Sequence, residues 1–125
     1  MKKLTDVCIM TNDIDRLCAY YRGLLDVEPV MEGEHAFFPL GGEANLAIWS
    51  YSSLEGMAPG ATASATGSGS VYIEFHVEDV DAEYRRLLAL GSHIDKVPTT
   101  FAWGTRAVWF RDPDGNRISF HGPPV

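Results

Sequence analysis

The sequence has few cysteines, no run of basic residues and no long apolar segment, and each shortage excludes a class of protein. Its two cysteines, Cys8 and Cys18, are too few for a disulfide framework. No second pair stands at metal-ligand spacing, so we expect two free thiols in a reducing cytoplasm. The basic start at residues 1–3 is followed by Thr5 and Asp6 rather than an apolar run, so we expect no signal peptide.

The charge balance excludes two kinds of partner. Ten Lys and Arg stand against 17 Asp and Glu, which gives a formal net charge of −7 over 125 residues. Nucleic acids and anionic membranes both require a basic surface, so neither is an expected partner. Residues 56–77 hold little charge but are rich in Gly, Ser, Thr and Ala, so they do not predict a membrane span. The acidity itself indicates solubility or, as a sharper alternative, a cationic ligand.

Apolar periodicity predicts alternating strands and helices along the chain. Asn12 or Asp13 would cap a first helix with a buried stripe, and Asp79 a second helix that ends at Gly91. The first helix's stripe is Ile14, Leu17, Cys18, Tyr21 and Leu25; the second's is Val80, Tyr84, Leu87 and Leu88. We predict strands over residues 4–11, 27–30, 35–40, 45–51, 71–77, 94–97 and either side of 112–116, with a flexible connection over 52–70.

The last hairpin has the clearest local signal. Its turn is Asp112-Pro113-Asp114-Gly115-Asn116, between two aromatic runs. Pro113 sets φ for the second position of a type I turn, Asp112 can bond the turn backbone, and Gly115 supplies a positive φ. The sequence therefore predicts two antiparallel strands joined by a tight turn with a bulge.

The two halves of the chain repeat one order of elements. A strand followed by a capped helix begins at Asp6 and again at Tyr72, 66 residues later, and Asp13 then aligns with Asp79. We predict a single α+β domain, residues 1–125, made of two βαβββ modules. The first module spans about 1–55, the linker about 56–70 and the second module about 71–125.

Three segments resemble the vicinal-oxygen-chelate superfamily of glyoxalases, bleomycin-resistance proteins and extradiol dioxygenases. They are residues 6–16 (DVCIMTNDIDR), residues 78–81 (EDVD), and the closing hairpin with WGTR at 103–106 and FRDPDGN at 110–116. The hairpin is most similar to the bleomycin-resistance branch. The resemblance implies paired βαβββ modules forming a cup-shaped mixed sheet, and a homodimer.

The resemblance also implies positions for a divalent metal, which this sequence does not fill well. The family's ligand positions, occupied there by His and Glu, fall on Asp6, Tyr72, Ser119 and a residue near Trp49. None of these is His, and a carboxylate, phenol, hydroxyl and indole do not make a divalent site. We therefore expect no metal cofactor. The alternative is a shifted set, Glu74, His76 and His121, which would come together if their two strands are neighbours in the sheet. His35 and His93 are expected to be surface residues.

Without a metal, the inner face of the sheet has the composition of a small-molecule site, an aromatic wall with a few polar groups. We expect no catalytic residues, since Ser119 and His121 lack an orienting carboxylate. We expect a cytoplasmic small-molecule-binding protein rather than an enzyme. The candidate ligand is a cationic aromatic antibiotic, which the protein would sequester. The alternative is a metal-dependent lyase, isomerase or dioxygenase. The ligand-binding candidates are Asp6, Trp49, Tyr72, Glu74, His76, Trp103, Trp109, Ser119 and His121, with Cys8 and Met10 beside them.

Overall fold

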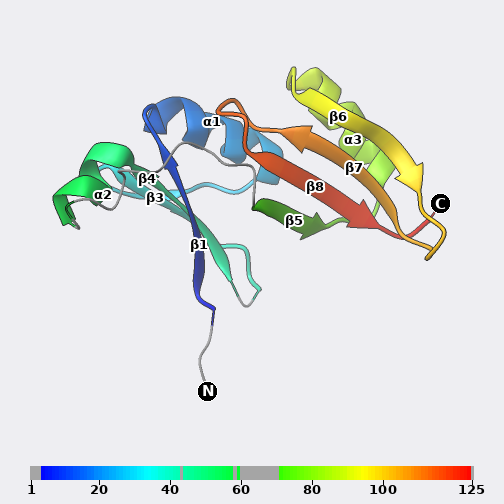
Figure 1. Ribbon diagram of the computed structural model, residues 1–125, viewed down its shortest axis with the longest axis horizontal. Helices are drawn as coiled ribbons and strands as arrows, with labels where there is room; N and C mark the ends of the chain where they lie inside the picture. Colours follow the sequence, from blue (N-terminus) through cyan, green and yellow to red (C-terminus); the bar gives the residue numbers. More distant parts are fainter. Residues whose placement is uncertain (1–3, 43, 58, 60–70, 125) are drawn as a thin grey trace. The chain divides into compact units, whose positions relative to one another are not determined.

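The computed structural model describes residues 4–42, 44–57, 59 and 71–124, and it divides the chain into two compact units, Met1–Thr66 and Gly67–Val125. Each unit holds one four-stranded mixed sheet, and the two sheets have equivalent strand orders, β1-β4-β3-β2 and β5-β8-β7-β6. The expected α+β fold with two repeated modules is therefore confirmed (Figure 1). The predicted linker falls largely outside the described residues.

The first unit packs one helix against its sheet. Asp13 caps α1 by accepting a hydrogen bond from the Arg16 N–H (3.1 Å), as predicted. Tyr21 of α1 is fully buried, and its ring lies 6.3 Å from that of Phe38 on β3. The unit's elements are β1 Asp6–Thr11, α1 Ile14–Leu25, β2 Val30–Glu32, β3 His35–Phe38, β4 Asn45–Ser50 and α2 Tyr51–Met57.

Two expectations for this unit were wrong. The edge strand is Val30–Glu32 rather than residues 27–30, because the proline at 29 has no N–H for a ladder and pairing begins after it. Residues 51–57 form helix α2 instead of the end of a strand and the start of a flexible connection. Ser50 starts this helix, since its hydroxyl accepts the Ser53 N–H at 3.0 Å.

The second unit repeats the plan with α3 on one face of its sheet. Asp79 caps α3 through the Ala82 N–H (3.0 Å), and Gly91 follows the helix with φ of +71°. In Figure 1, β5, β8, β7 and β6 lie side by side, with α3 behind β6 and β7. The elements are β5 Tyr72–His76, α3 Val80–Ala89, β6 His93–Thr100, β7 Arg106–Arg111 and β8 Arg117–Gly122.

Two features of this unit differ from the prediction: α3 buries fewer residues, and the edge strand β6 is longer. Leu88 is 53% exposed, because it stands one residue, about 100°, around the helix from the buried Leu87. Strand β6 also continues through Pro98, where a short strand was expected to stop. Proline is tolerated there because β6 is an edge strand and its pairing with β7 is irregular between Lys96 and Thr99.

The closing turn forms as expected. The Gly115 N–H donates to the Asp112 carbonyl (2.9 Å), and Gly115 takes a φ of +86°. The buried Asp112 carboxylate accepts the N–H groups of Asp114 and Asn116 and the Asn116 amide, at 2.8–2.9 Å. This turn fixes the register that places Arg111 opposite Arg117.

No helix in the described ranges is long and apolar enough to cross a membrane.

An ion pair ties β7 to the first turn of α3. Arg106 donates two hydrogen bonds to Asp81, from Nη2 at 2.8 Å and from Nε at 3.0 Å. Hydrogen bonding to Arg106, more than its charge, holds the pKa of Asp81 below its usual value of 3.8. The pair therefore stabilises the fold above pH 3.8, and that contribution is lost as the pH falls through the lower folded pKa.

We expect the Asp81→Asn variant to be less stable than the wild type at neutral pH. The difference in free energy of unfolding should shrink below pH 3.8, because the wild-type carboxyl then also becomes protonated. Urea unfolding across this range measures it, with Asp114→Asn, an exposed carboxylate at the turn, as control. A difference that stays constant down to acid pH would show that the pair does not contribute as described.

Candidate functional site

Six of the nine predicted ligand-binding residues lie on one face of the second sheet, opposite α3. Ladder registers establish this, because Glu74 pairs with Ser119 and Ser119 in turn pairs with Trp109. We call this surface the open face. The six residues on it are Tyr72, Glu74, His76, Trp109, Ser119 and His121.

Side-chain contacts on the open face join neighbouring strands. The Ser119 hydroxyl donates to Glu74 Oε1 at 3.2 Å. The Tyr72 ring stacks on Trp109 with 5.3 Å between centroids. Ser119 is completely buried, although it lies on the face away from the helix. Ser119 is thus engaged with a carboxylate rather than with a histidine, and no serine nucleophile is formed here.

The remaining three predicted residues lie elsewhere. Asp6 and Trp49 share one face of the first sheet, since Asp6 pairs with Asn45 and the alternation carries on to Trp49. His35 was expected on the surface, but it stacks on Trp49 with 4.0 Å between ring centroids. Trp103 lies between β6 and β7, is 74% exposed, and stacks on Phe101 at 4.8 Å.

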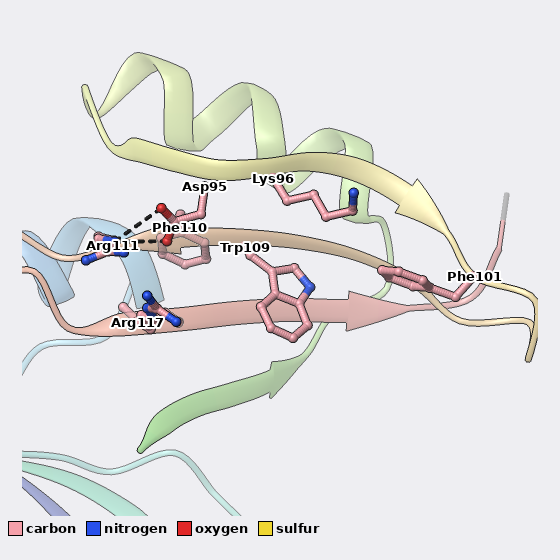
Figure 2. A pocket seen from close by; sticks show the side chains of 8 residues that line it. Asp95, Lys96, Phe101, Trp109, Phe110, Arg111 and Arg117 are labelled. Atoms are coloured by element: carbon pink, nitrogen blue, oxygen red, sulfur yellow. Dashed lines mark hydrogen bonds and ion pairs between the residues drawn. The ribbon is translucent and has the colours of Figure 1, made fainter. Parts of the chain in front are cut away.

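A cavity of about 420 Å³ opens on this unit, within the range of small-molecule sites. Trp109 is the predicted site residue among its lining, and Figure 2 shows its indole lying over the sheet with Arg117 on one side and Phe101 on the other. The cavity is lined by Asp95, Lys96, Phe101, Trp109, Phe110, Arg111, Arg117 and Ile118.

An irregularity in β6 brings two consecutive charged residues to the cavity. Ile94 pairs with Phe110 and Lys96 pairs with Trp109, so two steps along β6 match one step along β7. This is a β-bulge, which breaks the alternation of sides along the strand. Asp95 and Lys96 therefore both line the cavity, where a regular strand would send them to opposite faces.

Charges in the lining are only partly paired. Asp95 accepts two hydrogen bonds from Arg111 Nε, at 3.0 and 3.2 Å, and lies 3.3 Å from the imidazole of His93. The side chains of Lys96 and Arg117 make no ion pair or hydrogen bond with the residues that the structure describes. The cavity thus combines aromatic surface with two cations that have no carboxylate partner there.

Sequence reasoning missed these three cations, Lys96, Arg111 and Arg117. A signal for two of them was present, since Arg111 stands two residues after Trp109 and faces Arg117 across the turn. Strand alternation in the hairpin therefore places both arginines on the face of Trp109. Lys96 had no such signal, because no residue in the sequence predicts the bulge that brings its side chain to the cavity.

The donors at the family's metal positions do not fit a divalent ion. Ser119 is held by Glu74, Trp49 is stacked on an imidazole, and only Asp6 offers a carboxylate. Glu74, His76 and His121 share the open face, and the two histidine rings lie 5.5 Å apart. Even so, no three His, Cys, Asp or Glu side chains in the described ranges gather closely enough to hold one metal.

The thiols are free, as expected, and neither is activated. Burial of part of Cys8 and then the nearby Asp6 charge raise the pKa of its thiol, against a hydrogen bond with Trp49 that lowers it. Burial raises the pKa of Cys18 as well, although Arg22 acts in the opposite direction. Both thiols are therefore protonated at neutral pH and poor nucleophiles.

The chain is similar to a known protein family and to several solved structures. A family model described as the Glyoxalase/Bleomycin resistance protein/Dioxygenase superfamily matches residues 3–120. No curated protein matches the chain. Among solved structures, a glyoxalase/bleomycin resistance protein/dioxygenase family enzyme from Burkholderia phytofirmans PsJN superposes with a TM-score of 0.87 at 19% identity, covering 98% of this chain and 100% of that one.

Two further structures show the range of proteins that share the fold. The fosfomycin resistance protein FosX from Listeria monocytogenes has a TM-score of 0.76 at 19% identity, covering 100% of this chain and 96% of its own. A lactoylglutathione lyase from Agrobacterium tumefaciens has a TM-score of 0.71 at 24% identity, covering 95% and 92%. At these identities the likeness concerns the fold alone.

Proposed function

The chain belongs to the glyoxalase/bleomycin resistance protein/dioxygenase superfamily, and on that premise we propose that it binds a small organic molecule, without a metal ion, in the cavity beside Trp109. The observation that carries the proposal is the cavity itself, about 420 Å³ with an indole in its lining. Tryptophan offers a large flat apolar surface that stacks on planar ligands.

The lining does not support a cationic ligand, the class that the acidic composition suggested. Lys96, Arg111 and Arg117 outnumber the single carboxylate of Asp95 at this site. Net charge describes the whole surface, whereas a ligand responds to the groups within a Debye length of about 10 Å. A homodimer and a cytoplasmic location remain predictions from the sequence.

Binding without a metal is tested on purified protein treated with a chelator. We expect no stoichiometric Zn, Ni, Mn or Fe in elemental analysis of the untreated protein. A planar aromatic compound that binds should stabilise the treated and untreated protein equally, by about 2.7 kcal/mol at 100 times its dissociation constant. Thermal unfolding with a panel of such compounds measures this.

The metal-dependent alternative has the opposite outcome. A stoichiometric divalent metal, lost in the His76→Ala variant and required for ligand binding, would support a lyase, isomerase or dioxygenase that uses Glu74, His76 and His121. The Cys18→Ala variant is the control for His76→Ala, and its metal content should equal that of the wild type. Cys18 is a buried thiol on α1, in the other unit.

A further inference from the structure

Resting on the proposed function, the chemistry of the lining identifies a ligand class. We propose that the cavity binds a planar organic anion, its ring against Trp109 and its oxyanion between Lys96 and Arg117. Figure 2 shows Arg117 to one side of the Trp109 indole and Lys96 above it on β6. Three features of the lining favour such a ligand: the position of the cations, the neutralisation of the nearby carboxylate, and an indole donor without an acceptor.

The two cations flank the indole from neighbouring strands. Lys96 on β6 is the cross-strand partner of Trp109 on β7. Arg117 on β8 stands diagonally to Trp109, whose direct partner is Ser119. Direct and diagonal neighbours on one face lie about 5 and 7–8 Å apart at their Cβ atoms, within reach of long side chains. An anionic group on a ring stacked on Trp109 could therefore meet both.

The carboxylates of this face do not cancel these charges. Asp95 is occupied by Arg111, which donates to both of its oxygens, and by His93 at 3.3 Å. Glu74 is two strands away from Trp109 on β5, is not part of the lining, and accepts the Ser119 hydroxyl. Among the groups that line the cavity, positive charge is in excess, although the whole chain is acidic.

The indole N–H of Trp109 is buried and has no acceptor among the residues that the structure describes. A buried donor without an acceptor destabilises the fold, whereas an anionic oxygen accepts a strong hydrogen bond. Guanidinium groups in addition match the geometry of carboxylate and phosphate oxygens, to which they donate two hydrogen bonds at once. An oxyanion beside Trp109 would therefore have two charged donors, the ammonium of Lys96 and the guanidinium of Arg117. The indole N–H, which in Figure 2 points away from Arg117, would be a further donor only on its own side of the ring.

Three probes of one ring system separate charge from stacking. They are 2-naphthoate, the neutral 2-naphthamide and the cationic 2-(aminomethyl)naphthalene, each titrated calorimetrically into the wild-type protein. We expect naphthoate to bind about tenfold or more tightly than naphthamide, and the cation most weakly, since hydrogen bonds to charged groups are the stronger ones. The advantage of naphthoate should decrease as salt is added.

Substitution of Lys96 and Arg117 tests whether these two cations cause the preference for naphthoate. Lys96→Met and Arg117→Met should each weaken naphthoate binding about three- to tenfold, and the double variant should bind naphthoate no better than naphthamide. Both residues are exposed, so the variants should fold. Arg85→Met removes an exposed cation from α3, on the other face of the sheet, and should leave naphthoate binding unchanged.

The outcomes distinguish this inference from the proposed function. If all three probes bind equally well, or if the cation binds best, the charge preference is overturned while binding in the cavity stands. If naphthoate binds best but the double Met variant keeps that preference, the assignment to Lys96 and Arg117 is overturned. If no probe binds, the cavity proposal and the inference fail together.

Discussion

Replacing Gly122 by alanine is expected to lower the free energy of unfolding by about 1–3 kcal/mol, as overpacking of a close-packed interior does. Gly122 is the last residue of β8 and is buried. A Cβ there would overlap the carbonyl of Val77, just after β5, and would press on Val80 at the start of α3. Backbone cannot move aside like a flexible side chain, so the strand end and helix start must shift.

The matched control is Gly42→Ala. Apart from its chain neighbours, no atom of the described residues lies within 4 Å of a Cβ at Gly42, and its φ is not positive, so this variant should stay within about 0.5 kcal/mol of the wild type. Urea or guanidinium unfolding of both variants measures the difference. Equal stability of the two variants would show that β8 and the segment after β5 are not packed as closely as described.

Replacing Trp109 by leucine is expected to weaken binding of a planar ligand about tenfold or more. Leucine keeps apolar cover over the sheet but loses the flat ring, and aromatic stacking together with lost area amounts to about 1.4 kcal/mol or more. The substitution also removes the stack on Tyr72. Calorimetric titration with 2-naphthoate measures the binding, and circular dichroism and thermal unfolding verify that the variant is folded.

Trp103→Leu is the control for this substitution. Trp103 is 74% exposed and is not part of the cavity lining, so its loss should change affinity by no more than about twofold. This comparison also tests the expectation from the sequence that Trp103 binds ligand. If Trp103→Leu weakens binding as much as Trp109→Leu does, the site extends to the β6–β7 connection or lies there.

Local chemistry made much of the fold predictable. Asp13 and Asp79 cap their helices because a short acceptor before an apolar stripe satisfies free N–H groups wherever it occurs. Asp112 and Gly115 likewise determine the last turn, because the hydrogen bonds that form it lie within the five residues 112–116. The alternation of residues 72–76, 106–111 and 117–121 then placed six predicted site residues on one face.

What escaped prediction depends on contacts distant in sequence. The bulge at Asp95 and Lys96 arises from pairing with β7, and no local residue signals it. Pro98 indicated the end of a strand, but an edge position accepts it. The cavity lining therefore shares Trp109 alone with the nine predicted ligand-binding residues. The expected positive charge of the ligand followed from the total composition rather than from the groups beside Trp109.

The central claim, that a small molecule binds on the open face beside Trp109, is tested most directly by the indole resonances in a ¹H–¹⁵N spectrum. The chain has three tryptophans, so the Trp109 signal is assigned by its absence in Trp109→Leu. On addition of 2-naphthoate, we expect the Trp109 indole signal to move saturably, because its buried N–H gains an acceptor. A Trp109 signal that stays unmoved at naphthoate concentrations saturating by calorimetry would contradict the claim.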